Sequence, residues 1–198
     1  MNRSFIKDNN GNTYEDERAR EIMKILDKSD YLLDIHNTLN EENSVPFLIS
    51  EYPELGKYFD VEKIISGFDE LHPGGSDSYM NSIGKIGLCL ESGSIYDPKG
   101  QEIAKKGITN FLKYTKNTSG EAETYKNQEF IRFDTIYKNR TLDFKFEKEF
   151  LDFEKIQKGQ VIGYDGGKKV ISDRDGYIVF TYVPKNIGDE VFCLGYRI

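Results

Sequence analysis

The fold is decided by residues 30–39, DYLLDIHNTL, in which an apolar run ends in an aspartate and a histidine. An apolar run of this length is typical of a short strand inside a parallel sheet that is covered on both faces. In such sheets, ligands bind beyond the carboxyl ends of the strands. The stretch therefore predicts a strand over 31–35 that delivers Asp34 and His36, on one face, to the rim of a site. The alternative is a hydrogen-bonded histidine with a structural role.

Outward from this strand, helical spacing and apolar runs alternate, which predicts an α/β layer over residues 1–115. In the last helix of this layer, over 97–116, Asp97 is the expected N-cap, Pro98 lies in the first turn, and the inner stripe is Ile103, Ala104, Ile108, Phe111 and Leu112. The other predicted elements are a helix over 15–30, strands over 45–50 and 85–93, helical turns over 51–65 and a polar loop over 68–84.

The sequence changes character after this layer. Residues 116–128 are polar and predict a linker. In residues 129–198, alternating apolar and polar residues are punctuated by Asp-Gly and Gly-Asp pairs, a pattern that predicts a small antiparallel β unit with tight turns.

Composition excludes several classes of protein. A net charge of −7 and a pI near 5.0 argue against nucleic acid as a partner. No apolar run is long enough to span a membrane, and no secretory signal is visible at the start, so the expected compartment is the cytoplasm. Cys89 and Cys193 each lie in an apolar run, which favours buried free thiols over a disulfide or a metal site.

Glu91 is the second candidate for chemistry, because it ends the buried strand GLCLE. A carboxylate between an apolar and a wet environment can have a raised pKa and act as a general base; the alternative is a solvated glutamate. Asn2 and Arg3 form a pair that can bind a carboxylate. His72 lies in the turn-forming LHPGG and is expected at the surface. These residues alone support a soluble α/β domain with a site at His36 and Glu91.

Five segments in one order resemble the succinylglutamate desuccinylase/aspartoacylase family of zinc carboxypeptidase-like enzymes. They are NRSF (2–5), YEDERAREI (14–22), LLDIHNT (32–38), GLCLESG (87–93) and the tail from FLDFEKIQKGQ onward (150–198). The resemblance covers nearly the whole chain. It implies a zinc carboxypeptidase-like mixed sheet with flanking helices, followed by the small antiparallel β unit.

The resemblance also implies a function. The chain resembles a cytoplasmic hydrolase that cleaves the amide bond of a small N-acyl amino acid with one zinc ion. His36 would be a zinc ligand, Glu91 the catalytic base, and Asn2 and Arg3 would bind a substrate carboxylate. The family's His-x-x-Glu motif, which supplies two further ligands, has no counterpart here. The resemblance therefore implies an N-terminally truncated chain, an exposed sheet edge, and a missing N-terminal segment or complementary chain as partner.

Two other readings stay open. The chain can be a non-catalytic remnant that binds a small carboxylate ligand or a partner subunit. Residues 116–198 can also be an interaction module that resembles lipoyl-type half-barrels, in which Lys168 and Lys169, next to Gly166 and Gly167, keep a carrier role open.

Overall fold

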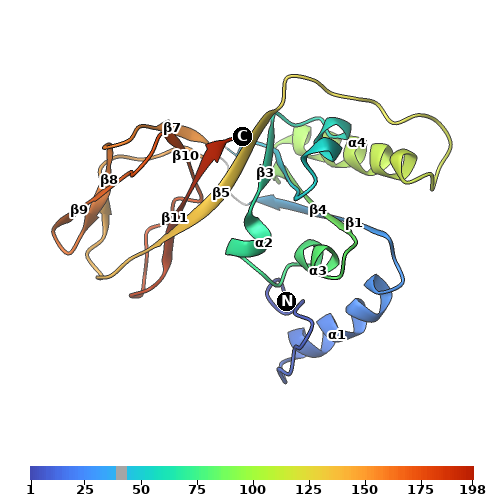
Figure 1. Ribbon diagram of the computed structural model, residues 1–198, viewed down its shortest axis with the longest axis horizontal. Helices are drawn as coiled ribbons and strands as arrows, with labels where there is room; N and C mark the ends of the chain where they lie inside the picture. The colour runs from blue at the N-terminus through green and yellow to red at the C-terminus, as the bar shows by residue number, and fades with distance from the viewer. Residues whose placement is uncertain (39–43) are drawn as a thin grey trace. The chain divides into compact units, whose positions relative to one another are not determined.

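The computed structural model describes residues 1–38 and 44–198, which divide into two compact units, Met1–Phe130 and Ile131–Ile198 (Figure 1). Residues 116–128, predicted as a linker, belong to the first unit. The N–H of Tyr125 donates to the carbonyl of Lys57 at 2.7 Å. The side-chain amide of Gln128 donates to three carbonyls of that unit, those of Gly56, Phe59 and Val61.

The first unit is a mixed sheet with helices on both faces, as the sequence predicts. Its strands follow the order β1-β4-β2-β3, in which β1 is parallel to β4, β2 is antiparallel to β4, and β3 is parallel to β2. The elements are α1 (Tyr14–Leu26), β1 (Tyr31–Thr38), β2 (Phe47–Ile49), η1 (Pro53–Tyr58), β3 (Lys63–Ser66), α2 (Phe68–Leu71), α3 (Ser76–Ser82), β4 (Ile86–Ser94) and α4 (Pro98–Tyr114).

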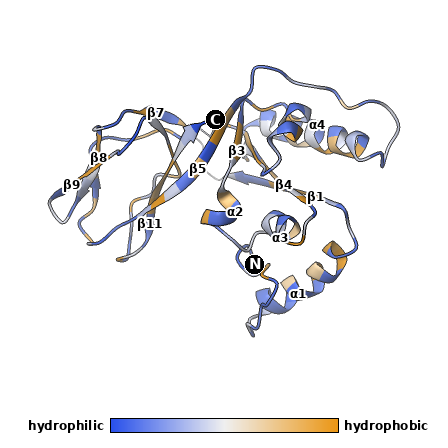
Figure 2. Cartoon of the chain, in the orientation of Figure 1, coloured by the Kyte–Doolittle hydropathy of each residue, from blue (hydrophilic) through white to orange (hydrophobic). Residues whose placement is uncertain are grey.

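Two apolar cores cover β1 from opposite sides, because successive side chains of a strand alternate between its faces. Leu32 packs with α1 and α3, in a core built around Met23 and Met80. Leu33 packs into the core that holds Leu88 and Phe111, on the side of α4. Hydrophilic and hydrophobic residues alternate along α1 and α4, as expected of helices with one covered face (Figure 2).

Two predicted segments differ from the structure. Residues 51–65 form a 3-10 helix and then strand β3, whose Ile64 and Ile65 are fully buried. Residues 68–84 are not a loop but contain α2 and α3. Their polar composition hides the helices, because the buried residues of α3 are three consecutive ones, Ser78, Tyr79 and Met80, and give no helical period in the sequence. Gly75 at the N-cap position and Asp77 in the first turn are the sequence signals of this helix start.

Helix α4 begins as predicted but faces the sheet differently. Asp97 accepts a hydrogen bond from the N–H of Lys99 at 2.9 Å and caps the helix. Ile108 and Leu112, predicted in the inner stripe, are 42% and 39% exposed. Gly107 lies close to β4, because a Cβ there would lie 2.7 Å from the side chain of Leu90. Because glycine has no side chain, the side of α4 that carries Gly107 packs closely against the sheet. Ile108 and Leu112 then face outward.

The second unit is all β, as predicted. One antiparallel sheet has the order β5-β11-β10-β7, and a smaller one has the order β6-β8-β9. The aromatic core between them includes Phe144, Phe150 and Phe192. The strands are β5 (Glu129–Lys138), β6 (Lys145–Phe146), β7 (Glu154–Ile156), β8 (Val161–Asp165), β9 (Lys168–Ile171), β10 (Gly176–Val179) and β11 (Glu190–Arg197).

Both cysteines are buried free thiols, as predicted. No helix in residues 1–38 and 44–198 has the length and apolar character needed to cross a membrane.

Candidate functional site

The pairing of β1 with β4 brings the two predicted site residues together. His36 lies opposite Glu91 in the parallel register, near the carboxyl ends of both strands. The Nδ1 atom of His36 is 3.8 Å from Oε1 of Glu91, and both side chains are partly exposed. The Ser92 hydroxyl donates to the His36 carbonyl at 3.0 Å and ties the two strand ends together. The contact joins residues 55 positions apart, and the parallel sheet alone produces it.

Asp34 holds the other side of the imidazole. Its Oδ1 is 3.3 Å from Nε2 of His36, so the two residues share a face of β1 as predicted. The hydroxyl of Ser76, at the start of α3, donates to Oδ2 of Asp34 at 2.5 Å. The hydrogen bond with Asp34 raises the pKa of His36, against the effect of burial. The same bond lowers the pKa of Asp34, and the Ser76 hydroxyl adds to the effect. A carboxylate on one ring nitrogen leaves Nδ1 directed toward Glu91.

Asp77 is a further acidic group that the sequence analysis missed. It lies in the first turn of α3, and its charge acts on Asp34, His36 and Glu91. Burial raises the pKa of Asp77, and the charge of Asp34 raises it further. Burial also raises the pKa of Glu91, where Asp34 and Asp77 add to the shift and His36 opposes it. Three carboxyl groups around one imidazole create a negative field that favours a bound cation.

His36, Cys89 and Glu91 can each offer a ligand atom, and these atoms lie within 4.8 Å of one another. Nitrogen, sulfur and carboxylate oxygen are zinc donors, and three protein ligands with an open position are typical of catalytic zinc. The donor types and their spacing therefore fit zinc. Burial raises the pKa of the Cys89 thiol, so without a cation this sulfur is protonated and is the weakest of the three donors.

Asn2 and Arg3, in the N-terminal segment, lie against the loop that precedes α3, residues 72–75. The N–H of Phe5 donates to the Gly74 carbonyl at 3.1 Å, and a Cβ on Gly74 would lie 2.7 Å from the carbonyl oxygen of Arg3. Both side chains are exposed, and the Arg3 guanidinium donates to the carbonyl of Asn2 at 2.8 Å. The loop continues into Ser76, the residue that holds Asp34. The structure thus connects the N-terminal pair to the site through the backbone of this loop.

His72 is a partly exposed residue at the end of α2. Its ring stacks on Phe68, with centroids 5.4 Å apart and planes 20° apart. This stacking supplies a structural role for His72, in line with the expectation of a histidine near the surface.

Asp69 extends the acidic region and gives a prediction for pH. Burial raises its pKa to about 6, the charges of Asp77 and Glu51 add to the shift, and a hydrogen bond from Asn81 opposes it. When folding raises the pKa of an acid, the folded state binds the proton more tightly than the unfolded state does. The free energy of unfolding then falls as the pH rises through the interval between the two pKa values. Below pH 4 the group is neutral in both states. Between pH 4 and 6 the unfolded state ionises first, and the folded state loses stability.

Asp69→Asn is therefore expected to raise the unfolding temperature above pH 6, and the gain should vanish as the pH falls to about 4. Thermal unfolding followed by circular dichroism between pH 4 and 8 measures this. Glu121→Gln, at an exposed position of the same unit, is the matched control and should show no such trend. A pH-independent gain for Asp69→Asn would contradict the prediction.

Comparison with known proteins shows where this fold occurs. No protein-family model matches the sequence, and no curated protein matches it. Solved structures do. Succinylglutamate desuccinylase from Vibrio parahaemolyticus is 17% identical with a TM-score of 0.76, over 100% of this chain and 64% of its own. Succinylglutamate desuccinylase/aspartoacylase from Rhodobacter sphaeroides is 20% identical with a TM-score of 0.71, over 100% of this chain and 67% of its own.

A third similar structure is the ectoine utilization protein EutE from Ruegeria pomeroyi, 20% identical with a TM-score of 0.66, over 98% of this chain and 69% of its own. The chain therefore has the fold of the succinylglutamate desuccinylase/aspartoacylase structures, as the sequence resemblance implies. It spans 64% of the length of the Vibrio parahaemolyticus enzyme. Identities this low establish a shared fold, and the chemistry must be argued from the site.

Proposed function

We propose that this chain forms part of a zinc-dependent hydrolase that cleaves the amide bond of a small N-acyl amino acid. The observation that carries the proposal is the pairing of His36 with Glu91 across the ends of β1 and β4, with Asp34 behind the imidazole. The shared fold with proteins named as desuccinylases and aspartoacylases supports the reaction class. The two buried free thiols support a reducing compartment, for which we propose the cytoplasm.

His36 is proposed to hold the metal through Nδ1, because Nε2 is engaged by Asp34. A carboxylate on the distal nitrogen of a metal-bound histidine fixes the ring and raises its basicity, and Ser76 in turn fixes that carboxylate. When bound, zinc supplies Lewis acidity, which polarises a carbonyl group. The negative field of Asp77 and Glu91 favours the cation at this position.

Glu91 is proposed as the general base. Its carboxylate faces the imidazole of His36 from the next strand, at the end of a run whose residues Leu88 to Leu90 are buried. A raised pKa brings a carboxylate closer to neutral pH, where it can accept a proton and return it to the leaving amine. Arg3, with Asn2, is proposed to bind a carboxylate of the substrate, since its guanidinium has no acidic partner among the described residues.

With Glu91 as the base, His36 and the protonated Cys89 are the donors of this cluster that remain for zinc. We therefore also propose that further ligands come from additional polypeptide docked on the outer edge of β1. The carbonyls of Asp30 and Thr38 accept hydrogen bonds from β4-side N–H groups, those of Ile86 and Ile95. In a strand, the backbone N–H and C=O groups of successive residues point to alternate edges. The groups of the odd-numbered residues of β1, from Tyr31 to Asn37, therefore point to its outer edge, away from β4. In the part of the chain that the structure describes, no strand pairs with that edge.

The flank of α4 near this edge is also apolar. Asn110 turns toward η1, and Phe111 contacts Tyr31 of β1, with ring centroids 6.3 Å apart. At 100° per residue, Ile108 and Leu112 lie on the side opposite Asn110, and both are exposed. Strand β1 contains no lysine, arginine or proline, the residues that commonly protect an edge. An added strand would cover both the edge and this flank.

Zinc content of the purified chain, alone and as His36→Ala, tests the proposal. About one zinc per chain, lost in His36→Ala, is expected if His36 is a ligand and the site is completed within these residues, and assays with N-acyl amino acids then follow. No zinc in the chain alone is expected if the remaining ligands reside on additional polypeptide. Zinc that His36→Ala retains in full would contradict the assignment of His36 in either case.

Assays on the same purified chain distinguish the hydrolase from the non-catalytic alternative. A remnant that binds a small carboxylate should bind N-acetylaspartate without hydrolysing it, and Glu91→Gln should leave that binding unchanged. Hydrolysis that depends on Glu91 would exclude the remnant.

A further inference from the structure

A cavity of about 540 Å³ lies in the second unit, between strands β5 and β11 and the β8–β9 hairpin. Its volume falls in the range of small-molecule sites. We infer that this cavity binds a small organic anion with an apolar tail, at a site separate from His36 and Glu91. The inference is independent of the proposed hydrolase function, because every lining residue belongs to residues 131–198.

The floor of the cavity is apolar and rigid. Ile162 is fully buried, Phe192 is 2% exposed and Leu194 is 5% exposed. The ring of Tyr137 stacks on Phe192, with centroids 5.0 Å apart and planes 5° apart. These buried side chains support the wall from behind, and the accessible apolar surface of the cavity comes from Tyr137 and Val170, which are partly exposed, and from Ile171, which is 50% exposed.

The buried carboxylate in the wall has no spare acceptor for a ligand. Asp165 accepts hydrogen bonds from the N–H groups of Arg140 and Thr141 at 2.7 and 3.0 Å, from the Tyr137 hydroxyl at 2.8 Å and from the Thr141 hydroxyl at 2.5 Å. Burial raises the pKa of Asp165, but these bonds outweigh it and the pKa is lowered. Asp165 therefore stays ionised and serves to hold the wall.

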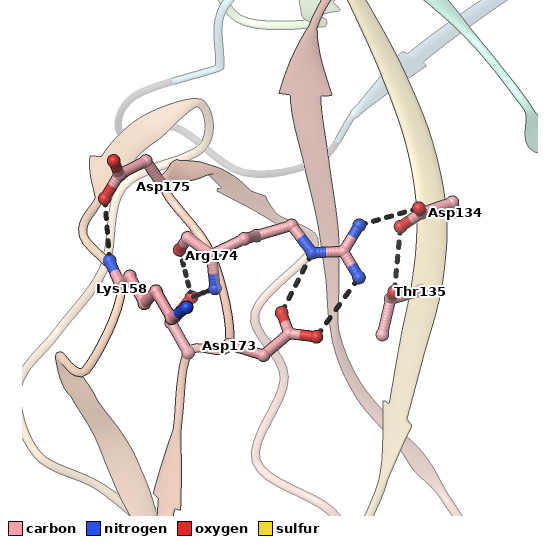
Figure 3. A network of polar contacts seen from close by, with 7 residues as sticks. Asp134, Thr135, Lys158, Asp173, Arg174 and Asp175 are labelled. Atoms are coloured by element: carbon pink, nitrogen blue, oxygen red, sulfur yellow. Dashed lines mark hydrogen bonds and ion pairs between the residues drawn. The ribbon is translucent and has the colours of Figure 1, made fainter.

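The acidic and hydroxyl groups at the rim are also engaged. The Arg174 guanidinium binds both oxygens of Asp173, at 2.9 and 3.2 Å, and reaches Asp134 at 2.7 Å (Figure 3). The hydroxyl of Thr135 donates to Asp134 at 2.8 Å in the same network. Asp173 is thereby held within the protein by a guanidinium that it shares with Asp134.

Three cations of the lining have no such partner. Arg140, Lys168 and Lys169 form no ion pair with any residue in the described part of the chain. Lys168 and Lys169 follow the turn Gly166–Gly167, whose two positive φ angles, 58° and 71°, suit the two-residue turn of a β-hairpin. Both lysines are exposed and belong to the lining of the cavity at the start of β9.

Charge and shape together define the class of ligand. The lining holds three cations, Arg140, Lys168 and Lys169, and two carboxylates, those of Asp165 and Asp173, so its formal charge is positive in a chain whose net charge is −7. A carboxylate or phosphate head group would interact with the cations of the lining, and an apolar tail of several carbons would pack against the accessible side chains of Tyr137, Val170 and Ile171. Neither a purely polar anion nor a neutral apolar molecule would satisfy both surfaces.

The test is titration of the full chain with hexanoate, followed by ¹H–¹⁵N spectra, with acetate and 1-hexanol as probes of the head and the tail alone. Saturable shifts are expected at Ile162, Lys169 and Val170, with hexanoate binding about ten-fold or more tightly than either probe. Hexyl phosphate in a parallel titration shows which head group is preferred. Hexanoate that binds no better than 1-hexanol, or shifts scattered over both units, would overturn the inference.

Reversing the charge of the two lysines of the lining distinguishes binding in the cavity from a general attraction of the anion to surface lysines. The double variant Lys168→Glu, Lys169→Glu is expected to weaken hexanoate binding about ten-fold or more. Lys155→Glu, on an exposed position of β7 outside the cavity, is the control and should leave binding within about two-fold. Since all three lysines are exposed, the variants should fold. Equal weakening by the control would refute the site, whatever the hydrolase assays show.

Discussion

Glu91→Gln is expected to lower the turnover of a small N-acyl amino acid by about 100- to 10,000-fold, the usual contribution of a general base. The substitution keeps the shape of the side chain and removes only the carboxylate. The measurement is kcat for N-acetylaspartate or N-succinylglutamate, made on the chain in whichever form hydrolyses them, alone or with additional polypeptide.

The same variant is expected to unfold at an equal or higher temperature. Burial and the charges of Asp34 and Asp77 disfavour the ionised form of Glu91. A neutral glutamine removes this unfavourable charge from the folded state. A loss of activity with no loss of stability is the signature of a group kept for chemistry. Glu102→Gln, on the exposed side of α4, is the control and should change neither quantity. Unchanged turnover in Glu91→Gln would end the proposed role.

Gly87→Ala is expected to destabilise the first unit by about 3 kcal/mol or more, a large value for a single methyl group. An ideal Cβ on Gly87 would lie 2.1 Å from the carbonyl oxygen of Asp77 and 2.6 Å from its Cα. These are backbone atoms of α3, so no side-chain rotation relieves the overlap. The helix must move away from β4, and the hydrogen bond from the Gly87 N–H to Asn81 at 2.8 Å would be strained with it.

Urea denaturation of Gly87→Ala against the parent chain measures this loss. Gly84→Ala is the matched control, since a Cβ there meets nothing within 4 Å and only the positive φ of 77° opposes it, at a cost of about 1 kcal/mol. Because α3 carries Ser76 and Asp77, a displaced helix should also disturb Asp34 and reduce zinc binding. Similar losses for both variants would show that α3 does not pack as described.

Within the site, sequence reasoning found the residues that end strands and missed those on α3. His36 and Glu91 follow apolar runs, and the carboxyl end of a buried strand is a recognisable position. Ser76 and Asp77 lie in a short polar helix with a weak periodic signal, so nothing local marks their proximity to Asp34. Ile108 and Leu112 were assigned to the core by spacing, which carries no information about the glycine contact that rotates α4.

The sequence by itself determined the α/β layer, the β unit after it, the cap of α4 and the strand ends that carry Asp34, His36 and Glu91. Each follows from local pattern, because alternation, caps and turns act over a few residues. Tertiary structure alone decided that His36 lies opposite Glu91, that Ser76 holds Asp34 and that Asp165 closes the wall of a cavity. These contacts join residues tens of positions apart, and strand register and helix packing, rather than any local preference, bring them together.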